Sequence, residues 1–571
     1  MVTNDSVGNT GRGTPEELLI CLREHVDNAR LDSAEALLHQ GAAESIEEYL
    51  NDNPERIDAV FIYAGVMFRV GRVEEAFHWY RDILKVEDNF GVYNQLACIC
   101  QTTGRLTEAV GYLKRAAALK PARLEVKANL AKALFEVGHV SEGIGMYREL
   151  VEKDPSNTKY HSSLLFFLHH LPELETEELF SEHLRWASRH DSSCSSIRSH
   201  LNSPDPDRKL RIGYLSGDMR RHSAAYFFES LLDGHDRDRY ELYGYGNVAW
   251  PDHYTSRLAE KFDVYHNIYG IEDAAAAAVI EADKIDILVE MNGHLGDSRV
   301  SLLMNRPAPV IVSYLAINTT AVGAVDYRFT DVCENPPGTE KYYTEKLVRL
   351  PGCHLCYRPP EFAPCVGPLP LDRNGFITFG SFNNHIKLHP HVIRNWAEIL
   401  KRCRGSRLVL KFGAGSDKVI KKRFMDQFRV LGVEAGRVNI HGRRKPAEHM
   451  AMYNEIDIAL DSWPFNGCTT TCEALWMGVP VISMSGENFV SRAALTILNT
   501  LDMDFFVANC EKEYIAKAIS LAENSESLRI IRNSMRARIA SSGLCDASAF
   551  ALKVEQAYRE MWEKWCRTKD K

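Results

Sequence analysis

The sequence has few of the features that mark membrane, secreted or nucleic-acid-binding proteins. Its 571 residues contain no long apolar run, and residues 1–15 are polar, without the apolar segment of a signal peptide. The formal net charge is −9, and one short basic cluster at 443–445 does not offset it, which argues against a general nucleic-acid binder. We therefore expect a cytoplasmic protein, with the nucleus possible in a eukaryote, and no nucleic-acid or membrane partner.

Several motifs of cofactor chemistry are also absent. The fourteen cysteines are scattered, which predicts reduced thiols and not a disulfide framework. The single C-x-x-C, Cys353-His-Leu-Cys356, has no second pair nearby, so we expect buried strand cysteines there and not a zinc or redox site. No G-x-x-x-x-G-K occurs and no G-x-G-x-x-G follows a strand. These absences argue against ATPase and dinucleotide-binding sites.

The first third of the chain has helical periodicity and repeats itself. Residues 1–15 have almost no apolar side chains to bury and are predicted to be disordered. Across 16–200, small residues and prolines recur every 33 or 34 positions: Gly71, Gly104 and Gly138; Ala76, Ala109 and Gly143; Ala64, Ala97 and Ala131; and Pro121 and Pro155. This spacing is typical of tetratricopeptide (TPR) repeats, which stack into a superhelix that binds peptides. The repeats either recruit protein substrates or only cap the next domain, and the sequence leaves both open.

Beyond a proline-bearing linker at 201–208, strand-like and helix-like runs alternate. Strands are expected at 210–216, 240–245, 285–290, 310–314 and 327–330, and in a second series at 376–380, 407–412, 438–441, 456–460 and 479–483. Alternation of this kind predicts parallel sheets covered by helices on both faces. We therefore expect two Rossmann-like lobes, 208–370 and 371–571, with a final amphipathic helix at 547–565 packed back on them.

Polar clusters follow four of the expected strands. They lie at 216–226, 290–299, 380–387 and 461–480. Because ligands of doubly wound sheets bind beyond the carboxyl ends of the strands, we expect all four clusters to face one crevice. The last cluster has a Gly-Thr-rich turn between a strand and a helix, and such a helix N-terminus binds anions. Together with Lys387, the turn at Thr469, Thr470 and Thr471 predicts a site for a leaving diphosphate.

The motifs at these positions resemble those of the TPR-containing protein O-glycosyltransferases, the O-GlcNAc transferase family with its SPINDLY branch. The resemblance covers about 55–565 and rests on Gly293-His294, Gly380-Ser-Phe-Asn-Asn384, Thr469-Thr-Thr-Cys-Glu473 and similar stretches. It implies a GT-B fold and metal-independent, inverting transfer of a sugar to Ser or Thr hydroxyls. A nucleotide sugar is then the co-substrate, and no cofactor is expected.

The resemblance also implies roles for particular residues. His222, His294 and Lys387 match catalytic positions, and the donor-binding set is Asn384, Lys387, Gly467, Cys468, Thr469, Thr470, Thr471 and Glu473. Glu473 stands where an acidic group is implied to bind the nucleotide ribose. Cys468 replaces a histidine of O-GlcNAc transferases and a threonine of SPINDLY proteins. The stretch 486–492 resembles the O-GlcNAc transferase branch, although more of the lobes resemble SPINDLY. The donor is therefore GDP-fucose or UDP-GlcNAc, with GDP-fucose slightly favoured.

The mechanism expected from these residues is a single displacement at the anomeric carbon, catalysed by positioning and by stabilisation of the leaving group. His222 and His294 both have suitable intrinsic pKa values for a general base, and Asp218 or a water chain are further options. Two other functions remain open: a GT-B enzyme acting on a small molecule or glycan, and a non-catalytic TPR scaffold. A homo-oligomer is possible.

Overall fold

The computed structural model describes residues 13–27, 31–191 and 200–569, which form two compact units divided between Met146 and Tyr147. Most of the predicted disordered start lies outside the described residues. The predicted helical domain ends at 200, whereas the helices at 158–190 belong to the second compact unit. The predicted domain boundaries therefore stay predictions, and each unit is described by itself.

The first unit consists of helices that follow the predicted repeat. They are α1 (Pro15–Asp27), α2 (Leu31–Leu37), η1 (Leu38–Ala42), α3 (Ala43–Asp52), α4 (Ile57–Arg69), α5 (Val73–Val86), α6 (Phe90–Thr103), α7 (Leu106–Leu119), α8 (Leu124–Glu136) and the start of α9 (Val140–Lys153). Gly71, Gly104 and Gly138 lie in the turns inside successive helix pairs, with φ of 86°, 79° and 93°. That left-handed conformation strains residues with a side chain, which explains the repeated glycine.

Small residues recur in the repeat because helices cross there. A Cβ on Gly143 would lie 2.7 Å from the Ala131 carbonyl oxygen. Ala64, Ala97 and Ala131 are almost fully buried, as are Ala76 and Ala109. The sequence periodicity thus reports close contacts between helices.

The second unit begins with α10 (Thr158–Leu168) and α11 (Thr176–His190) and continues into two parallel sheets. The first sheet has the order β3-β2-β1-β4-β5-β6-β7. Its strands are β1 (Leu210–Ser216), β2 (Tyr240–Gly246), β3 (Val264–Asn267), β4 (Ile287–Glu290), β5 (Val310–Ser313), β6 (Tyr327–Thr330) and β7 (Lys346–Arg349). Its helical segments are α12 (Ala225–Gly234), α13 (His253–Ala259), α14 (Asp273–Ala282), η3 (Val300–Asn305) and η4 (Thr339–Tyr342).

The second sheet has the order β10-β9-β8-β11-β12-β13. Its strands are β8 (Thr378–Ser381), β9 (Arg407–Lys411), β10 (Val438–His441), β11 (Ile458–Leu460), β12 (Val481–Met484) and β13 (Val507–Ala508). Its helical segments are α15 (Pro370–Asn374), η5 (His385–Lys387), α16 (Pro390–Arg402), α17 (Lys418–Val430), η6 (Ala435–Arg437), α18 (Pro446–Met452), η7 (Tyr453–Glu455), α19 (Thr469–Trp476), η8 (Phe489–Ser491), α20 (Ala493–Thr500), η9 (Asp504–Phe506), α21 (Glu511–Glu523) and α22 (Ser525–Ala540).

In each sheet the strand order reverses beside the first strand. The reversal lies between β1 and β4 in the first sheet and between β8 and β11 in the second. The four polar clusters predicted from the sequence follow these same four strands. Ligands of doubly wound sheets bind at such switch points, so the topology places all four clusters where binding is expected.

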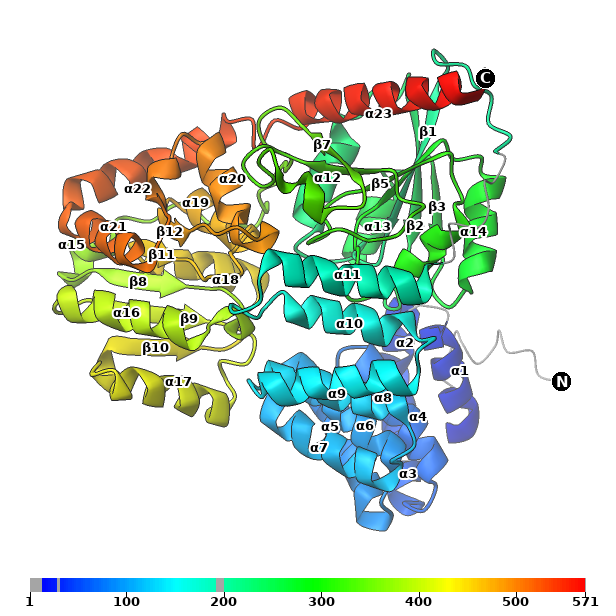
Figure 1. The fold of residues 1–571 in the computed structure, drawn as a ribbon. Helices are drawn as coiled ribbons and strands as arrows, with labels where there is room; N and C mark the ends of the chain where they lie inside the picture. Colours follow the sequence, from blue (N-terminus) through cyan, green and yellow to red (C-terminus); the bar gives the residue numbers. More distant parts are fainter. Residues whose placement is uncertain (1–12, 28–30, 192–199, 570–571) are drawn as a thin grey trace. The chain divides into compact units, whose positions relative to one another are not determined.

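The last helix, α23 (Ala547–Lys569), covers the first sheet although it follows the second in sequence (Figure 1). Phe550, Val554 and Trp562 share one buried core with Leu210 and Ile212 of β1. The expectation that this helix packs back on the lobes is confirmed.

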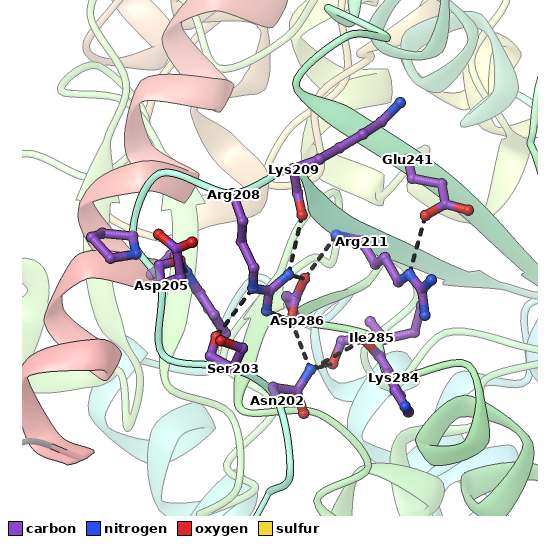
Figure 2. A network of polar contacts seen from close by, with 12 residues as sticks. Asn202, Ser203, Asp205, Arg208, Lys209, Arg211, Glu241, Lys284, Ile285 and Asp286 are labelled. Atoms are coloured by element: carbon purple, nitrogen blue, oxygen red, sulfur yellow. Dashed lines mark hydrogen bonds and ion pairs between the residues drawn. The ribbon is translucent and has the colours of Figure 1, made fainter.

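The linker before β1 is held against the first lobe by a buried carboxylate (Figure 2). Asp286, with 0% exposure, accepts hydrogen bonds from Arg208 Nη1 at 2.8 Å, Asn202 Nδ2 at 2.7 Å and the Arg211 backbone N–H at 2.8 Å. Arg211 in turn donates to Glu241 on β2. These bonds fix the path by which the chain enters the first strand.

Candidate functional site

The first-lobe clusters form an oriented acid–base pair. Asn292 accepts a hydrogen bond from the Gly217 backbone N–H at 2.8 Å and donates from Nδ2 to Asp218 Oδ2 at 2.7 Å. The other oxygen of Asp218 lies 3.3 Å from His222 Nδ1. Burial raises the pKa of Asp218 and lowers that of His222, while the attraction between the two groups opposes both shifts. The Ala224 backbone N–H also lies 3.3 Å from His222 Nδ1. Both contacts hold the ring at Nδ1, and neither involves Nε2, the atom that could exchange a proton with a substrate.

His294 lies in a different environment from His222. Its Nε2 lies 2.8 Å from the Thr320 carbonyl oxygen, which can only accept, so Nε2 carries the proton. Its Nδ1 lies 3.0 Å from Ser162 Oγ on α10, and Ser162 also accepts from Trp186 Nε1 at 3.1 Å. The residue is 4% exposed, and burial lowers its pKa to about 4. Both ring nitrogens of His294 are therefore engaged in packing α10 and α11 on the first lobe.

Glu290, at the end of β4, shapes the loop that carries Asn292. Its Oε1 accepts hydrogen bonds from the Asn292 and Gly293 backbone N–H groups, both at 2.7 Å. Burial raises its pKa to about 7, against the effect of these two bonds. The Glu290 carboxyl group thus fixes the turn at Asn292 and Gly293.

In the second lobe, Lys387 is held by the loop before α19. Its Nζ donates to the Asn466 carbonyl oxygen at 2.8 Å and lies 4.1 Å from the centroid of the Phe465 ring. Burial lowers its pKa to about 8, and the negative charge of Asp461 opposes this change. Asn384 begins the turn that carries Lys387, because its side chain accepts from the Ile386 backbone N–H at 3.3 Å.

The Gly-Thr turn is organised by Asp461 and Asn383. Asp461 Oδ1 accepts from the Gly467 N–H at 2.7 Å and from Asn383 Nδ2 at 3.0 Å. Thr470 Oγ1 donates to Asn383 Oδ1 at 3.0 Å, and Thr471 Oγ1 donates to the Gly467 carbonyl at 2.9 Å. A Cβ on Gly467 would lie 2.3 Å from Thr470 Oγ1, so any side chain at this position would force the turn to shift.

Helix α19 begins directly after this turn, with Cys468 as its N-cap residue and Thr469 as its first residue. The first-turn N–H groups of a helix have no acceptor within the helix. Cys468, Thr469 and Thr470 are half-buried. The Thr471 N–H already bonds the Cys468 carbonyl oxygen at 3.1 Å, so the donors left for a ligand are those nearer the helix start. The turn therefore combines N–H groups of a helix end with a nearby ammonium group, an arrangement suited to a diphosphate.

Glu473 is held by residues that the sequence reasoning missed. Its Oε2 lies 2.9 Å from His449 Nε2 and accepts from Tyr453 Oη at 3.3 Å. His449 lies on α18 and Tyr453 on η7, and no local pattern linked either of them to Glu473. Only folding brings the three side chains together.

A buried charged triad, also missed, lies in the first lobe, in the loops that follow β6 and β7, where residues of the second lobe contact it. His354 Nδ1 is 2.6 Å from Asp331 Oδ2, and its Nε2 is 2.7 Å from Glu334 Oε2. Burial alone would lower the pKa of His354, but the two carboxylates raise that pKa to about 10. From the second lobe, Thr496 Oγ1 donates to Asp331 at 3.1 Å and Arg492 Nε donates to the Cys333 carbonyl at 2.7 Å.

Cys468 lies close to this triad. Burial, followed by the charge of Glu334, raises the pKa of its thiol to about 12. Cys353 and Cys356 are buried, as predicted, although they lie after β7 and not on a strand. Within the part of the chain that the structure describes, no group of three or more His, Cys, Asp or Glu side chains is arranged to hold a metal. Among those same residues, every helix is too short or too polar to span a bilayer.

Comparison with known proteins identifies the architecture. The chain matches the model of glycosyl transferase family 41 over residues 190–356 and 369–554, and a tetratricopeptide-repeat model over 102–165. A solved mutant of the O-GlcNAc transferase of Thermobaculum terrenum superposes with a TM-score of 0.83 at 34% identity, covering 90% of this chain and 98% of that one. The predicted fold, helical TPR repeats followed by two Rossmann-like lobes of the GT-B type, is confirmed.

Curated relatives are similar over the lobes. The chain is 38% identical over 426 residues to the probable UDP-N-acetylglucosamine–peptide N-acetylglucosaminyltransferase SPINDLY of Arabidopsis thaliana, covering 72% of this chain and 46% of the relative. It is 37% identical over 428 residues to the protein with the same description in Petunia hybrida, covering 72% and 45%. The chain thus spans about half the length of the curated relatives it matches. Because the family model covers more than half of the chain, the chain belongs to glycosyl transferase family 41.

Proposed function

We propose that this protein is an O-glycosyltransferase that moves a sugar from a nucleotide sugar to Ser or Thr hydroxyls of proteins. The observation that carries the proposal is the Lys387 ammonium group, held by the Asn466 carbonyl and the Phe465 ring beside the N-terminus of α19. A fixed cation and free backbone N–H groups stabilise a leaving diphosphate without a metal. Family membership supports the same reading.

In this proposal the second lobe binds the donor. Lys387 and the turn of Gly467, Cys468, Thr469, Thr470 and Thr471 contact the phosphates. Glu473, fixed by His449 and Tyr453, faces the nucleoside. Asn384 acts by shaping the turn that carries Lys387.

The first lobe activates the acceptor in this proposal. Between the two histidines, the geometry favours His222 as general base, because Asp218 orients its ring and Nε2 is left for the hydroxyl proton. His294 instead holds α10 and α11 to the lobe, since both of its nitrogens are engaged. The acceptor oxygen attacks the anomeric carbon opposite the diphosphate, and its proton passes to His222 as the bond to the leaving group breaks.

The test of this proposal uses both candidate donors, UDP-GlcNAc and GDP-fucose. The names of the relatives point to UDP-GlcNAc, and the resemblance of the lobes to SPINDLY proteins points to GDP-fucose. The protein is incubated with each donor and a mixture of Ser- and Thr-containing peptides, with and without a chelator. Mass spectrometry then follows addition of one sugar.

We expect addition from one donor, on Ser or Thr, with the same rate after chelation. No addition from either donor would overturn the proposal in favour of a scaffold or a different acceptor. Recruitment of protein substrates through the TPR groove is part of the proposal. It predicts faster transfer to long protein substrates than to short peptides in the full chain.

A further inference from the structure

The last helix pair before the sheets contacts the second lobe at several points, and one of these contacts is made by His170. His170 lies two residues after the end of α10, is 1% exposed, and stacks on Phe465 with ring centroids 4.8 Å apart and planes inclined by 29°. Its Nδ1 lies 3.2 Å from the Phe166 carbonyl oxygen, which fixes the ring on the end of the helix.

Phe465 is also the ring that contacts Lys387. The Lys387 Nζ lies 4.1 Å from its centroid and donates to the carbonyl of the next residue, Asn466. The Phe465 carbonyl in turn accepts from Ser462 Oγ at 2.7 Å. One short, internally bonded segment therefore holds the ammonium group, and His170 packs on that segment.

His170 also approaches the segment that carries the lysine. Burial lowers the pKa of His389, two residues after Lys387, to about 4, and a hydrogen bond to the His170 backbone partly opposes this change. Burial, followed by the charge of Lys387, lowers the pKa of His170 itself to about 3. His170 is therefore a neutral aromatic ring packed between the two segments that together place the ammonium group.

We propose that His170 is a positioning residue for Lys387 and acts through the Phe465 ring. The proposal rests on the proposed role of Lys387 at the leaving diphosphate. Removing the ring would free Phe465 to change rotamer and admit water to the ammonium group. A cation that is less well placed stabilises the transition state less, and this lowers kcat more than it changes the donor KM. Because His170 is neutral, phenylalanine should replace it and alanine should not.

The test compares His170→Ala, His170→Phe and the unaltered full chain. For His170→Ala we expect kcat to fall roughly tenfold with little change in donor KM, since small displacements at a catalytic group are costly. The alkaline limb of the pH profile, set by Lys387 with its pKa of about 8, should move to higher pH as water restores the lysine towards its ordinary value. His170→Phe should restore both kcat and the limb.

The matched control is His161→Ala. His161 is a buried histidine on α10, and its Nδ1 lies 3.1 Å from His190 Nε2. His161→Ala should leave the alkaline limb in place. If His170→Ala does not fold, Phe465→Leu removes the same stack from the other side and should give the same upward shift. An alkaline limb that is unchanged in the folded variant, or a fall in kcat that His170→Phe does not restore, overturns the proposal.

Binding of GDP and of UDP, titrated across pH by calorimetry, separates this proposal from the proposed function. One outcome is that the alkaline limb of nucleotide binding moves to higher pH in His170→Ala while the unaltered chain transfers no sugar. The positioning role then stands and the transferase assignment fails. If the unaltered chain transfers sugar and Lys387→Ala does not, but His170→Ala behaves as the unaltered chain, the transferase assignment stands and the positioning role fails. If neither nucleotide binds the unaltered chain, both fail.

Discussion

The two lobes have the same topology at their switch points but offer different chemistry there. Beside β1 and β4, a buried carboxylate orients a histidine whose side chain is 38% exposed. Beside β8 and β11, a half-buried lysine lies next to the N-terminus of a helix. The first site can exchange a proton with an incoming group, whereas the second can only hold negative charge. The difference comes from loop residues and not from the sheets, which illustrates how one fold carries distinct functions.

The largest effect should come from the triad that joins the lobes. His354→Ala leaves Asp331 and Glu334 buried without their cation, which typically costs about 3–5 kcal/mol of the free energy of unfolding. His354→Gln, which keeps hydrogen-bonding capacity, should cost less. Thermal melting at neutral pH measures both, and equal melting temperatures for His354→Ala and the unaltered chain would show that the triad does not hold the lobes.

The same triad should make the stability of the folded chain depend on pH. The pKa of His354 is raised from 6.5 to about 10 in the folded state, so its contribution is fully present below pH 6.5 and is lost as pH rises towards 10. The difference in melting temperature between the unaltered chain and His354→Ala should therefore be larger at pH 7 than at pH 9.5. A difference in melting temperature that grows from pH 7 to pH 9.5 would contradict the positive charge assigned to His354.

The second-lobe half of the comparison depends on Lys387. Lys387→Ala should lower kcat by about 10²–10³, the usual cost of losing a group that stabilises developing negative charge. Lys421→Ala is a matched control, because Lys421 also donates to a backbone carbonyl in this lobe, that of Ile440 at 3.1 Å. Near-normal sugar transfer by Lys387→Ala would remove the distinction drawn between the lobes.

The first-lobe half depends on His222. His222→Asn should lower kcat by about 10², at the low end for loss of a general base. Asp218→Asn should move the acid limb of the pH profile to lower pH, because Asp218 raises the pKa of His222 and the amide does not. His294→Gln should leave that limb unmoved. If the acid limb moved in His294→Gln and not in Asp218→Asn, the roles of the two histidines would be exchanged.

The smallest effect should come from the turn itself. In Gly467→Ala the new Cβ would lie 2.3 Å from Thr470 Oγ1, so the turn must shift by a small distance. We expect donor KM to rise by about tenfold, the result of roughly 1.4 kcal/mol of lost binding. Gly436→Ala in the same lobe meets no atom within 4 Å and serves as control. Steady-state kinetics with varied donor distinguishes the two.

Much of the fold was predictable because it depends on local pattern. Apolar runs marked the inner strands, and β1 and β6 have the predicted bounds. The missed strands β3, β7 and β13 are short and lie at or near sheet edges, where β3 and β7 are only partly buried and carry a weaker apolar pattern. The four polar clusters were placed correctly at strand ends, although their pairing within each lobe needed the strand order.

Some residues of the candidate site could likewise be predicted from the sequence and others could not. Lys387 and the Gly-Thr turn could be singled out from the sequence, because a strand, a turn and a helix start within a few residues are a local pattern typical of anion sites. The different environments of His222 and His294 could not, since both are loop histidines after a strand. Ser162 and Thr320, far apart in the chain, decide that His294 is engaged.

The sequence by itself therefore determined the repeats, the alternation of strands and helices, and the residue types at each strand end, because these follow from periodicities of a few residues. The tertiary structure alone decided which of those residues act together. It set Asp218 against His222, His354 between two carboxylates, and His170 against the Phe465 ring that holds Lys387. Burial and charge at a distance set pKa values and rotamers, and both depend on neighbours that only the folded chain brings together.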